Sequence, residues 1–148
     1  MRFVSAEEVD RVLTHAGLIE TLREAFRKGA VQPLRHHHTI ERPKGAASTL
    51  LLMPAWNDFA ADGFEGDGYV GVKIVTVSPD NNAKGLPAIM GVYLLLDGQT
   101  GEPKALIDGQ RITLWRTACA SALAADYLAR QDAETMLMVG AGALAPFL

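Results

Sequence analysis

The 148-residue sequence predicts an α+β protein, and three observations carry this prediction. Helix-like patterns lie near both ends of the chain, and the stretch between residues 34 and 107 alternates between apolar and polar residues as strands do. A buried-strand pattern near the C-terminus then runs into a glycine-rich turn. We therefore expect helices and a mostly antiparallel sheet over residues 1–130, followed over residues 131–148 by the first strand of an incomplete Rossmann domain.

The helices are expected from a capping signal and from periodicity. Ser5 and Glu8 have the spacing of a capping box, which predicts a short helix starting there. The apolar residues between Leu18 and Phe26 recur at helical spacing, which predicts an amphipathic helix. A third helix is expected from about Thr113 to Arg130, with many small residues on one side that would let another element pack closely.

The strands are expected from period-two alternation and from the turn residues between the alternating segments. Five such segments are predicted, at residues 34–41, 48–55, 69–77, 88–96 and 103–107. A further strand is expected at residues 135–139, where four apolar residues follow one another, as in a strand buried on both faces of a parallel sheet.

Composition and charge limit the possible partners and locations. The chain has 49% hydrophobic and 21% charged residues, which is typical of a soluble globular protein. Its net charge of -3 gives no electrostatic reason to expect nucleic acid or an acidic membrane as a partner. The single Cys119 excludes an internal disulfide and fits a reducing compartment, and no signal peptide or membrane span is indicated. We therefore expect a cytoplasmic protein.

Two cationic side chains stand out. Lys73 lies within a strand that is apolar on both faces, where a lysine is costly unless an anion meets it or its head reaches solvent. Arg116 would lie in the first turns of the third helix if Thr113 caps that helix, beside free amides that favour a carboxylate or phosphate. The ordinary alternative for Arg116 is a solvent-exposed surface arginine.

The run His36-His37-His38 raises a metal hypothesis, because His36 and His38 share one face of a strand. Two imidazoles need at least one further ligand, and no spaced Cys, His or Glu partner stands out in the sequence. A strand with ordinary polar positions is therefore favoured and no metal site is predicted. A histidine metal site would predict stoichiometric zinc or iron in the purified protein.

The stretch Gly140-Ala141-Gly142-Ala143 has the strand, glycine turn and helix-start pattern of a dinucleotide-binding fingerprint. The acidic ribose-binding residue expected about 20 positions later would fall beyond Leu148. The alternative is an apolar C-terminal strand followed by a flexible tail.

Together these motifs resemble the ornithine cyclodeaminase and mu-crystallin family. The matching stretches occur in family order and cover nearly the whole chain: Val31-Gln32-Pro33-Leu34-Arg35, Leu52-Met53-Pro54, Gly71-Val72-Lys73-Ile74-Val75, the segment from Leu95 to Gly101, Arg116-Thr117-Ala118 with Ser121-Ala122, and Val139-Gly140-Ala141-Gly142. The resemblance implies an N-terminal domain that binds substrate and forms a homodimer, followed by a Rossmann domain that binds NAD or NADP.

The resemblance also implies roles for particular residues. Arg35, Lys73 and Arg116 would hold the carboxylate of a small amino-acid or imino-acid substrate, and Lys73 could also assist proton transfer. The implied cofactor contacts are Ala88, Arg116, Thr117, Gly140, Gly142, Ala143 and Leu144. Family members usually have Gln where Leu144 stands, and the family's catalytic aspartate would lie beyond Leu148.

The implied activity is an NAD-dependent cyclodeamination of ornithine to proline and ammonia. Within the same family, reduction of ketimines or pyrroline carboxylates and alanine dehydrogenation remain open, because one carboxylate clamp serves all these reactions. A third alternative is a non-catalytic, truncated fragment that still dimerises or binds a small carboxylate. Because the catalytic aspartate would be missing, we expect the 148-residue chain to be inactive by itself. The sequence does not choose between NAD and NADP.

Overall fold

The computed structural model describes all 148 residues and confirms the α+β prediction. Its elements, in chain order, are β1 (Arg2–Val4), α1 (Ala6–Val12), α2 (His15–Lys28), β2 (His36–Ile40), β3 (Ser48–Trp56), β4 (Tyr69–Val77), the 3-10 helix η1 (Pro79–Lys84), β5 (Ile89–Asp97), β6 (Pro103–Asp108), α3 (Gly109–Leu128) and the 3-10 helix η2 (Ala145–Phe147). The five strands predicted between residues 34 and 107 are all present, with ends that differ by at most two residues.

The six strands form one sheet in the order β1-β6-β5-β4-β3-β2. All neighbouring pairs are antiparallel except β1 and β6, which are parallel. The register aligns four residues across the sheet in one row, which are Met53, Lys73, Tyr93 and Ile107. Because directly opposed residues project from the same face of a sheet, Lys73 and Tyr93 share a face.

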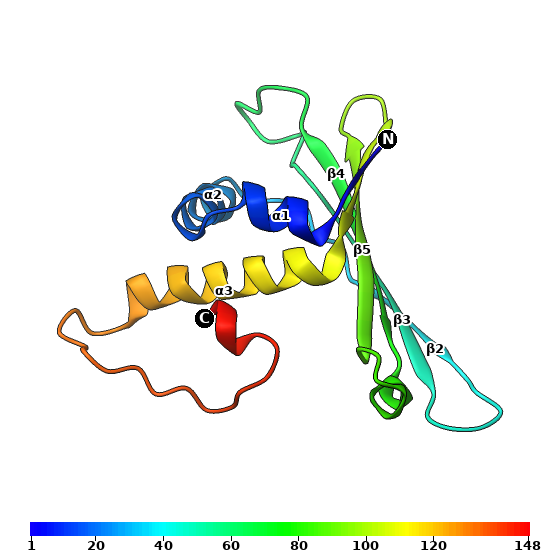
Figure 1. The fold of residues 1–148 in the computed structure, drawn as a ribbon. Helices are drawn as coiled ribbons and strands as arrows, with labels where there is room; N and C mark the ends of the chain where they lie inside the picture. Colours follow the sequence, from blue (N-terminus) through cyan, green and yellow to red (C-terminus); the bar gives the residue numbers. More distant parts are fainter.

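All three α-helices lie on one side of the sheet, and no helix covers the other side (Figure 1). The core lies between the helices, around Val9, Trp115 and Cys119, and the sheet residues Val4 and Ile107 pack against it. Ile107 belongs to the row that contains Lys73. The face that carries Lys73 is therefore the face under the helices.

The predicted capping box is present at the start of α1. The Glu8 backbone N–H donates to Ser5 Oγ at 3.3 Å, and the Ser5 N–H donates to Glu8 Oε2 at 3.0 Å. These reciprocal bonds satisfy backbone donors that the first turn of a helix leaves free. They fix the point where the chain leaves β1 and enters the helical layer.

The predicted start of the third helix was wrong. The helix α3 begins at Gly109, and Asp108 caps it by accepting a hydrogen bond from the Arg111 N–H at 2.7 Å. Thr113 lies one turn inside, where its hydroxyl donates to the Gly109 carbonyl at 2.5 Å. Arg116 is therefore about two turns into the helix and not beside its free amides.

The predicted strand at residues 135–139 is also absent. This segment runs as irregular chain, and Leu137 and Val139 are 87% and 92% exposed. A strand buried on both faces needs neighbouring strands to satisfy its backbone, and none of the six strands pairs with this segment. The chain instead turns back through η2, and the Phe147 ring meets the Trp115 ring edge to face at 6.2 Å.

Candidate carboxylate and cofactor site

A cavity of about 600 Å³ lies between strands β4 and β5 and the first turns of α3. Its walls include three of the residues singled out from the sequence, which are Lys73, Ala88 and Ala143. It also contains Gln110 and Arg111 from the start of α3. Most small-molecule sites are cavities of a few hundred cubic ångströms with a small number of converging polar groups, and this cavity has that character.

The close approach of α3 to the sheet forms one end of this cavity. A Cβ atom at Gly109 would lie 2.7 Å from the backbone of Gly91, so only glycine allows the helix to start there. The Gln110 Nε2 atom donates a hydrogen bond to the Ile89 carbonyl at 2.6 Å. The first turn of α3 is thus fixed against the beginning of β5, next to Ala88.

Lys73 is the cation that projects into the cavity from the sheet. Its side chain is half-buried, and burial lowers the pKa of its ammonium group, with smaller contributions from the positive charges of Arg116 and Arg35. A cation whose charged form is disfavoured by burial and by like charges is one that an anion would stabilise. Arg35 and Arg116 therefore each lie within electrostatic range of Lys73.

Arg35 and Arg116 reach this region from two other elements. Arg35 immediately precedes β2. Extending the β2–β3 register by one residue places Arg35 opposite Met53, and Met53 is itself directly opposite Lys73. Arg116 lies on the exposed side of α3. Neither arginine lines the cavity, so Lys73 is the only one of the three predicted cations in its wall. Arg111 is a second cation there, and its Nε lies 3.5 Å from Asp10 Oδ1.

The predicted cofactor residues are only partly brought together. Ala88 and Ala143 line the cavity, whereas Thr117, Gly140, Gly142 and Leu144 do not. Gly140 has a φ of 107°, which favours glycine, and no atom lies within 4 Å of a Cβ built at Gly140 or Gly142. The turn is therefore open enough for a phosphate to approach its backbone. It is followed by a 3-10 helix of three residues, so these residues do not build the helix N-terminus of a complete pyrophosphate site.

The histidine run does not gather ligands for a metal. The His36 and His38 rings lie on one strand face with centroids 6.2 Å apart. No group of three His, Cys, Asp or Glu side chains lies close enough together to hold a metal ion. The metal hypothesis therefore has no third ligand in this chain.

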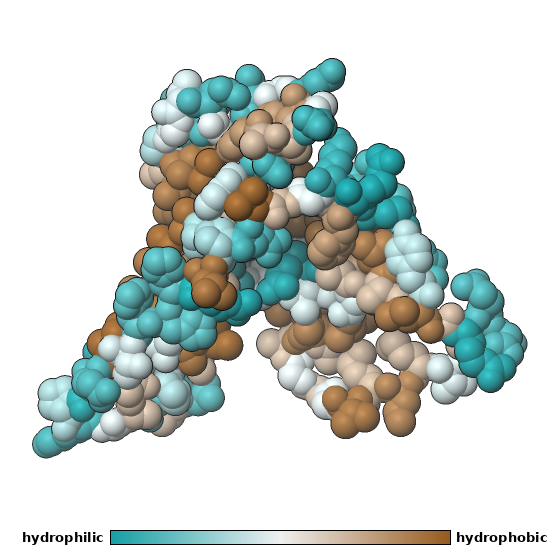
Figure 2. All heavy atoms as spheres, turned by 180° about the vertical axis from the view of Figure 1, so that it is seen from behind, coloured by the Kyte–Doolittle hydropathy of each residue, from teal (hydrophilic) through white to brown (hydrophobic).

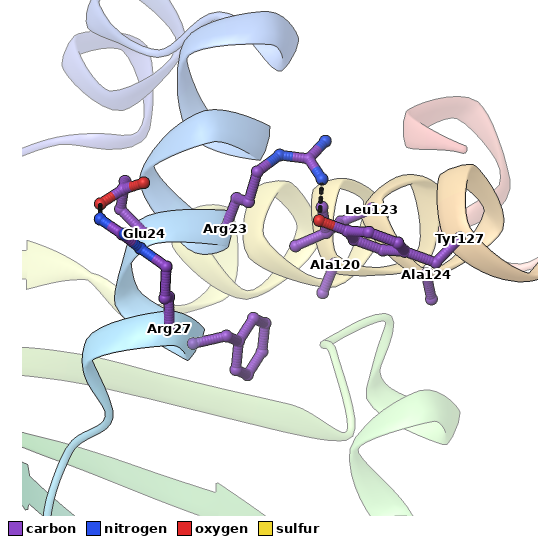
Figure 3. A pocket seen from close by; sticks show the side chains of 8 residues that line it. Arg23, Glu24, Arg27, Ala120, Leu123, Ala124 and Tyr127 are labelled. Carbon is purple, nitrogen blue, oxygen red and sulfur yellow. Dashed lines mark hydrogen bonds and ion pairs between the residues drawn. The ribbon is translucent and has the colours of Figure 1, made fainter.

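A second cavity of about 660 Å³ lies between α2 and α3 (Figure 3). Arg23 lies across it, hydrogen-bonded to the Tyr127 hydroxyl, and its guanidinium also forms an ion pair with Asp126 at 2.9 Å. This cavity contains none of the residues predicted to bind substrate or cofactor, and its central cation already has a carboxylate partner. A carboxylate site is therefore better placed at Lys73.

Sequence reasoning missed Asp108 and Gln110. Asp108-Gly109 directly follows a predicted strand, and Asp before a helix is a recognised capping signal. Reading that signal would have moved the start of the helix from Thr113 to Gly109 and placed Gln110 in its first turn. The hydrogen bond from Gln110 to Ile89 depends on tertiary packing and leaves no trace in the sequence.

The fold and the cavity define a class of protein: an α+β domain whose sheet and long helix form a cavity lined by Lys73. The chain belongs to the ornithine cyclodeaminase/mu-crystallin family, whose family model matches residues 1–148. Two curated relatives are similar over almost all of it. Protein SAR DEFICIENT 4 of Arabidopsis thaliana is 39% identical over 99% of the chain, and a Delta(1)-pyrroline-2-carboxylate reductase of Colwellia psychrerythraea is 34% identical over 100%.

Two solved structures share the fold. A Delta(1)-pyrroline-2-carboxylate reductase of Thermococcus litoralis in complex with NADH and L-proline is 32% identical, with a TM-score of 0.74 over 89% of this chain and 39% of its own. An archaeal alanine dehydrogenase dimer with bound NAD is also 32% identical, with a TM-score of 0.80 over 99% of this chain and 43% of its own. These structures confirm the family and the fold predicted from the sequence.

The chain spans less than half the length of these relatives, with 43% of the Arabidopsis protein and 45% of the Colwellia reductase covered. The activity, substrates and partners of a whole protein are therefore matters for proposal. None of the helices combines the length and the apolar character that crossing a membrane requires.

Proposed function

We propose that this chain is the substrate-binding portion of an NAD(P)H-dependent enzyme that reduces a cyclic imino acid, with Δ1-pyrroline-2-carboxylate as the leading substrate. The proposal rests on the position of Lys73. This half-buried cation lines the cavity between β4, β5 and α3, and Arg35 and Arg116 lie within electrostatic range of it. Several relatives of 34–35% identity are named as reductases of this imino acid, which supports this substrate class.

Ornithine cyclodeamination, the activity expected first from the sequence, is supported only by membership of the family. A lysine cyclodeaminase is among the solved structures, at 30% identity and a TM-score of 0.61. Its similarity to this chain is lower than that of the Thermococcus reductase or the alanine dehydrogenase. We therefore place imine reduction before cyclodeamination and alanine dehydrogenation.

The cationic group suits the carboxylate of the substrate. Lys73 can donate a charge-assisted hydrogen bond from the sheet to one carboxylate oxygen. An arginine such as Arg35 or Arg116 offers two parallel donors to a carboxylate. When bound, a reduced nicotinamide supplies the hydride for the imine carbon. Burial lowers the pKa of Lys73, and a carboxylate beside the ammonium group would stabilise its charged form.

A homodimer formed through the open face of the sheet is the second part of this proposal. The face opposite the helices carries a continuous apolar set, and hydrophobic residues gather along the sheet on the left of Figure 2. The register places six of its members side by side, namely Leu50, Leu52, Val72, Ile74, Val92 and Leu94. All six remain partly exposed, and a large apolar patch of this kind is typical of a protein interface.

Ligand binding by the 148-residue chain tests the carboxylate site. Pyrrole-2-carboxylate is a planar analogue of the cyclic imino acid, and calorimetric titration should show that it binds. Lys73→Met should weaken this binding by about tenfold or more, because a charge-assisted hydrogen bond contributes roughly 1.5–3 kcal/mol. Arg11→Met, at an exposed arginine of α1, is the matched control and should leave binding unchanged. Equal binding by the Lys73→Met variant would contradict the site.

Turnover tests the reaction itself. The chain can be extended at Leu148 with the nucleotide-binding half of the Colwellia reductase and supplied with NADH or NADPH. Oxidation of the reduced cofactor with Δ1-pyrroline-2-carboxylate is the expected result. Release of ammonia from ornithine with NAD, without any imine reduction, would instead assign the cyclodeaminase reaction.

A further inference from the structure

We propose that Gln110 is a specificity-determining residue of the Lys73 cavity, whose side-chain carbonyl accepts a hydrogen bond from the ring N–H of a bound cyclic amino or imino acid. The inference rests on the proposed function, because it concerns the substrate of the same cavity. It assigns a role to a side chain that the sequence motifs do not mark.

The orientation of the Gln110 carboxamide is set by its partner. Its Nε2 atom lies 2.6 Å from the Ile89 carbonyl oxygen, and a carbonyl oxygen can only accept a hydrogen bond. The nitrogen end of the amide must therefore face Ile89. The Oε1 atom receives no hydrogen bond from any residue of the chain, although Gln110 lines the cavity. An acceptor is thus left available to a ligand.

The other side-chain oxygens at this end of the cavity belong to Asp108 and Thr113. Asp108 Oδ1 receives the Arg111 N–H at 2.7 Å as the cap of α3. The Thr113 hydroxyl gives its proton to the Gly109 carbonyl at 2.5 Å. The backbone under Gln110 is also fixed, since Gly109 is in contact with Gly91. Gln110 therefore presents its oxygen from a rigid position, which a specific contact requires.

The chemistry of the substrate matches this arrangement. A cyclic imino acid carries its carboxylate and its ring nitrogen on the same carbon, so a cation and an acceptor are needed on two sides of that carbon. Lys73 from β4 and Gln110 from α3 line the same cavity, and Ile89, the partner of Gln110, lies opposite Val77, four residues along β4 from Lys73. A neutral carbonyl favours the protonated imine, which has an N–H, over the unprotonated form, which has none. The protonated imine is also the more electrophilic form.

A pair of ring analogues isolates this contact. Pyrrole-2-carboxylate and furan-2-carboxylate have nearly the same shape and the same carboxylate, but only the pyrrole has a ring N–H. Titration calorimetry with the 148-residue chain should show that the pyrrole binds about tenfold more tightly, because the furan would leave the Gln110 oxygen without a donor. Gln110→Met should bring the two affinities to near equality by weakening the pyrrole alone.

Control variants separate this role from a structural one. Gln99→Met, at an exposed position of the β5–β6 turn, should keep the tenfold preference. Thermal unfolding of each variant shows whether it is folded. If Gln110→Met does not fold, Gln110→Ala takes its place.

The outcomes distinguish the two proposals. If both analogues bind equally to the unmodified chain, or if Gln110→Met retains the preference, the role of Gln110 is overturned and the carboxylate site stands. The role of Gln110 is likewise overturned if Asp108→Asn removes the preference for the pyrrole over the furan and Gln110→Met does not. If neither analogue binds, the proposed function and this inference both fail.

Discussion

Asp10 of α1 accepts a hydrogen bond from the Trp115 indole Nε1 at 2.8 Å, across the junction between α1 and α3. The same carboxylate oxygen lies 3.5 Å from Arg111 Nε. Both α3 residues in turn meet Phe147: Trp115 edge to face, and Arg111 with its guanidinium carbon 5.6 Å from the centre of the ring. Asp10 therefore contacts both of the α3 side chains against which Phe147 packs.

Removal of this carboxylate should destabilise the fold. Asp10→Ala leaves the indole N–H of a Trp115 that is only 8% exposed without a partner, which costs roughly 1–3 kcal/mol. The urea midpoint of unfolding, followed by tryptophan fluorescence, should fall accordingly. Asp62→Ala, in an exposed loop, is the control and should leave the midpoint unchanged. Equal midpoints for the two variants would show that the hydrogen bond contributes nothing.

The contact between α3 and β5 should not tolerate a methyl group. Gly109→Ala would bring a Cβ within 2.7 Å of the Gly91 backbone, so the helix must move away from the sheet at a cost of about 1–3 kcal/mol. Binding of pyrrole-2-carboxylate should weaken as well, because this contact shapes the cavity. Gly142→Ala meets no atom within 4 Å and is the matched control for both measurements. Unchanged stability of Gly109→Ala would contradict the described packing.

A charge on the open face of the sheet should prevent dimerisation. Leu94→Lys places an ammonium group in the middle of the proposed interface, where burial without a partner is unfavourable. Sedimentation velocity should show a dimer for the unmodified chain and a monomer for this variant. Val12→Lys introduces the same charge at a residue of α1 that is 72% exposed and should remain dimeric. A monomeric unmodified chain would exclude this interface.

Lys73 should make stability depend on pH in the alkaline range. Because burial lowers its pKa in the folded state below the ordinary value of 10.5, the unfolded chain binds more protons between the two values. The free energy of unfolding contributed by this group therefore rises with pH through that window and is smallest below it. Lys73→Met should stabilise the fold at pH 7, and this gain should shrink as the pH approaches 10.5.

Urea midpoints of the unmodified chain and of Lys73→Met, measured at several pH values from 7 upward, check this expectation. Lys44→Met, at an exposed lysine, is the control and should show no such trend. A Lys73→Met variant that is destabilised at pH 7 would indicate that the stem of the lysine matters more than its buried charge.

The strands were predictable because alternation is a local property. The segment from residue 69 to 77 reads as a strand from its own composition, and the structure agrees. The strand β1 was missed because three residues are too few to show a period. The start of α3 was misplaced because Thr113 and Asp108 are both acceptable caps, and the structure shows that Asp108 is the residue that caps the helix.

The candidate site was predictable to a smaller extent. Lys73 stood out because a cation within an apolar strand is costly, and the structure places it in the cavity beside Ala88 and Ala143. The segment at residues 135–139 has the composition of a buried strand but lacks neighbouring strands, so its local pattern could not decide its conformation. Gln110 is polar, lies in a helix and has no distinctive neighbours, and only the bond to Ile89 draws attention to it.

Cys119 lies at the point where the helices meet, and it is 0% exposed. Burial raises the pKa of its thiol, so the reactive thiolate is scarce as well as covered. A thiol reagent can therefore reach it only when the helices separate from one another. The rate of labelling at this one sulfur would measure how often that separation occurs in the native state, without any label or probe having to be introduced.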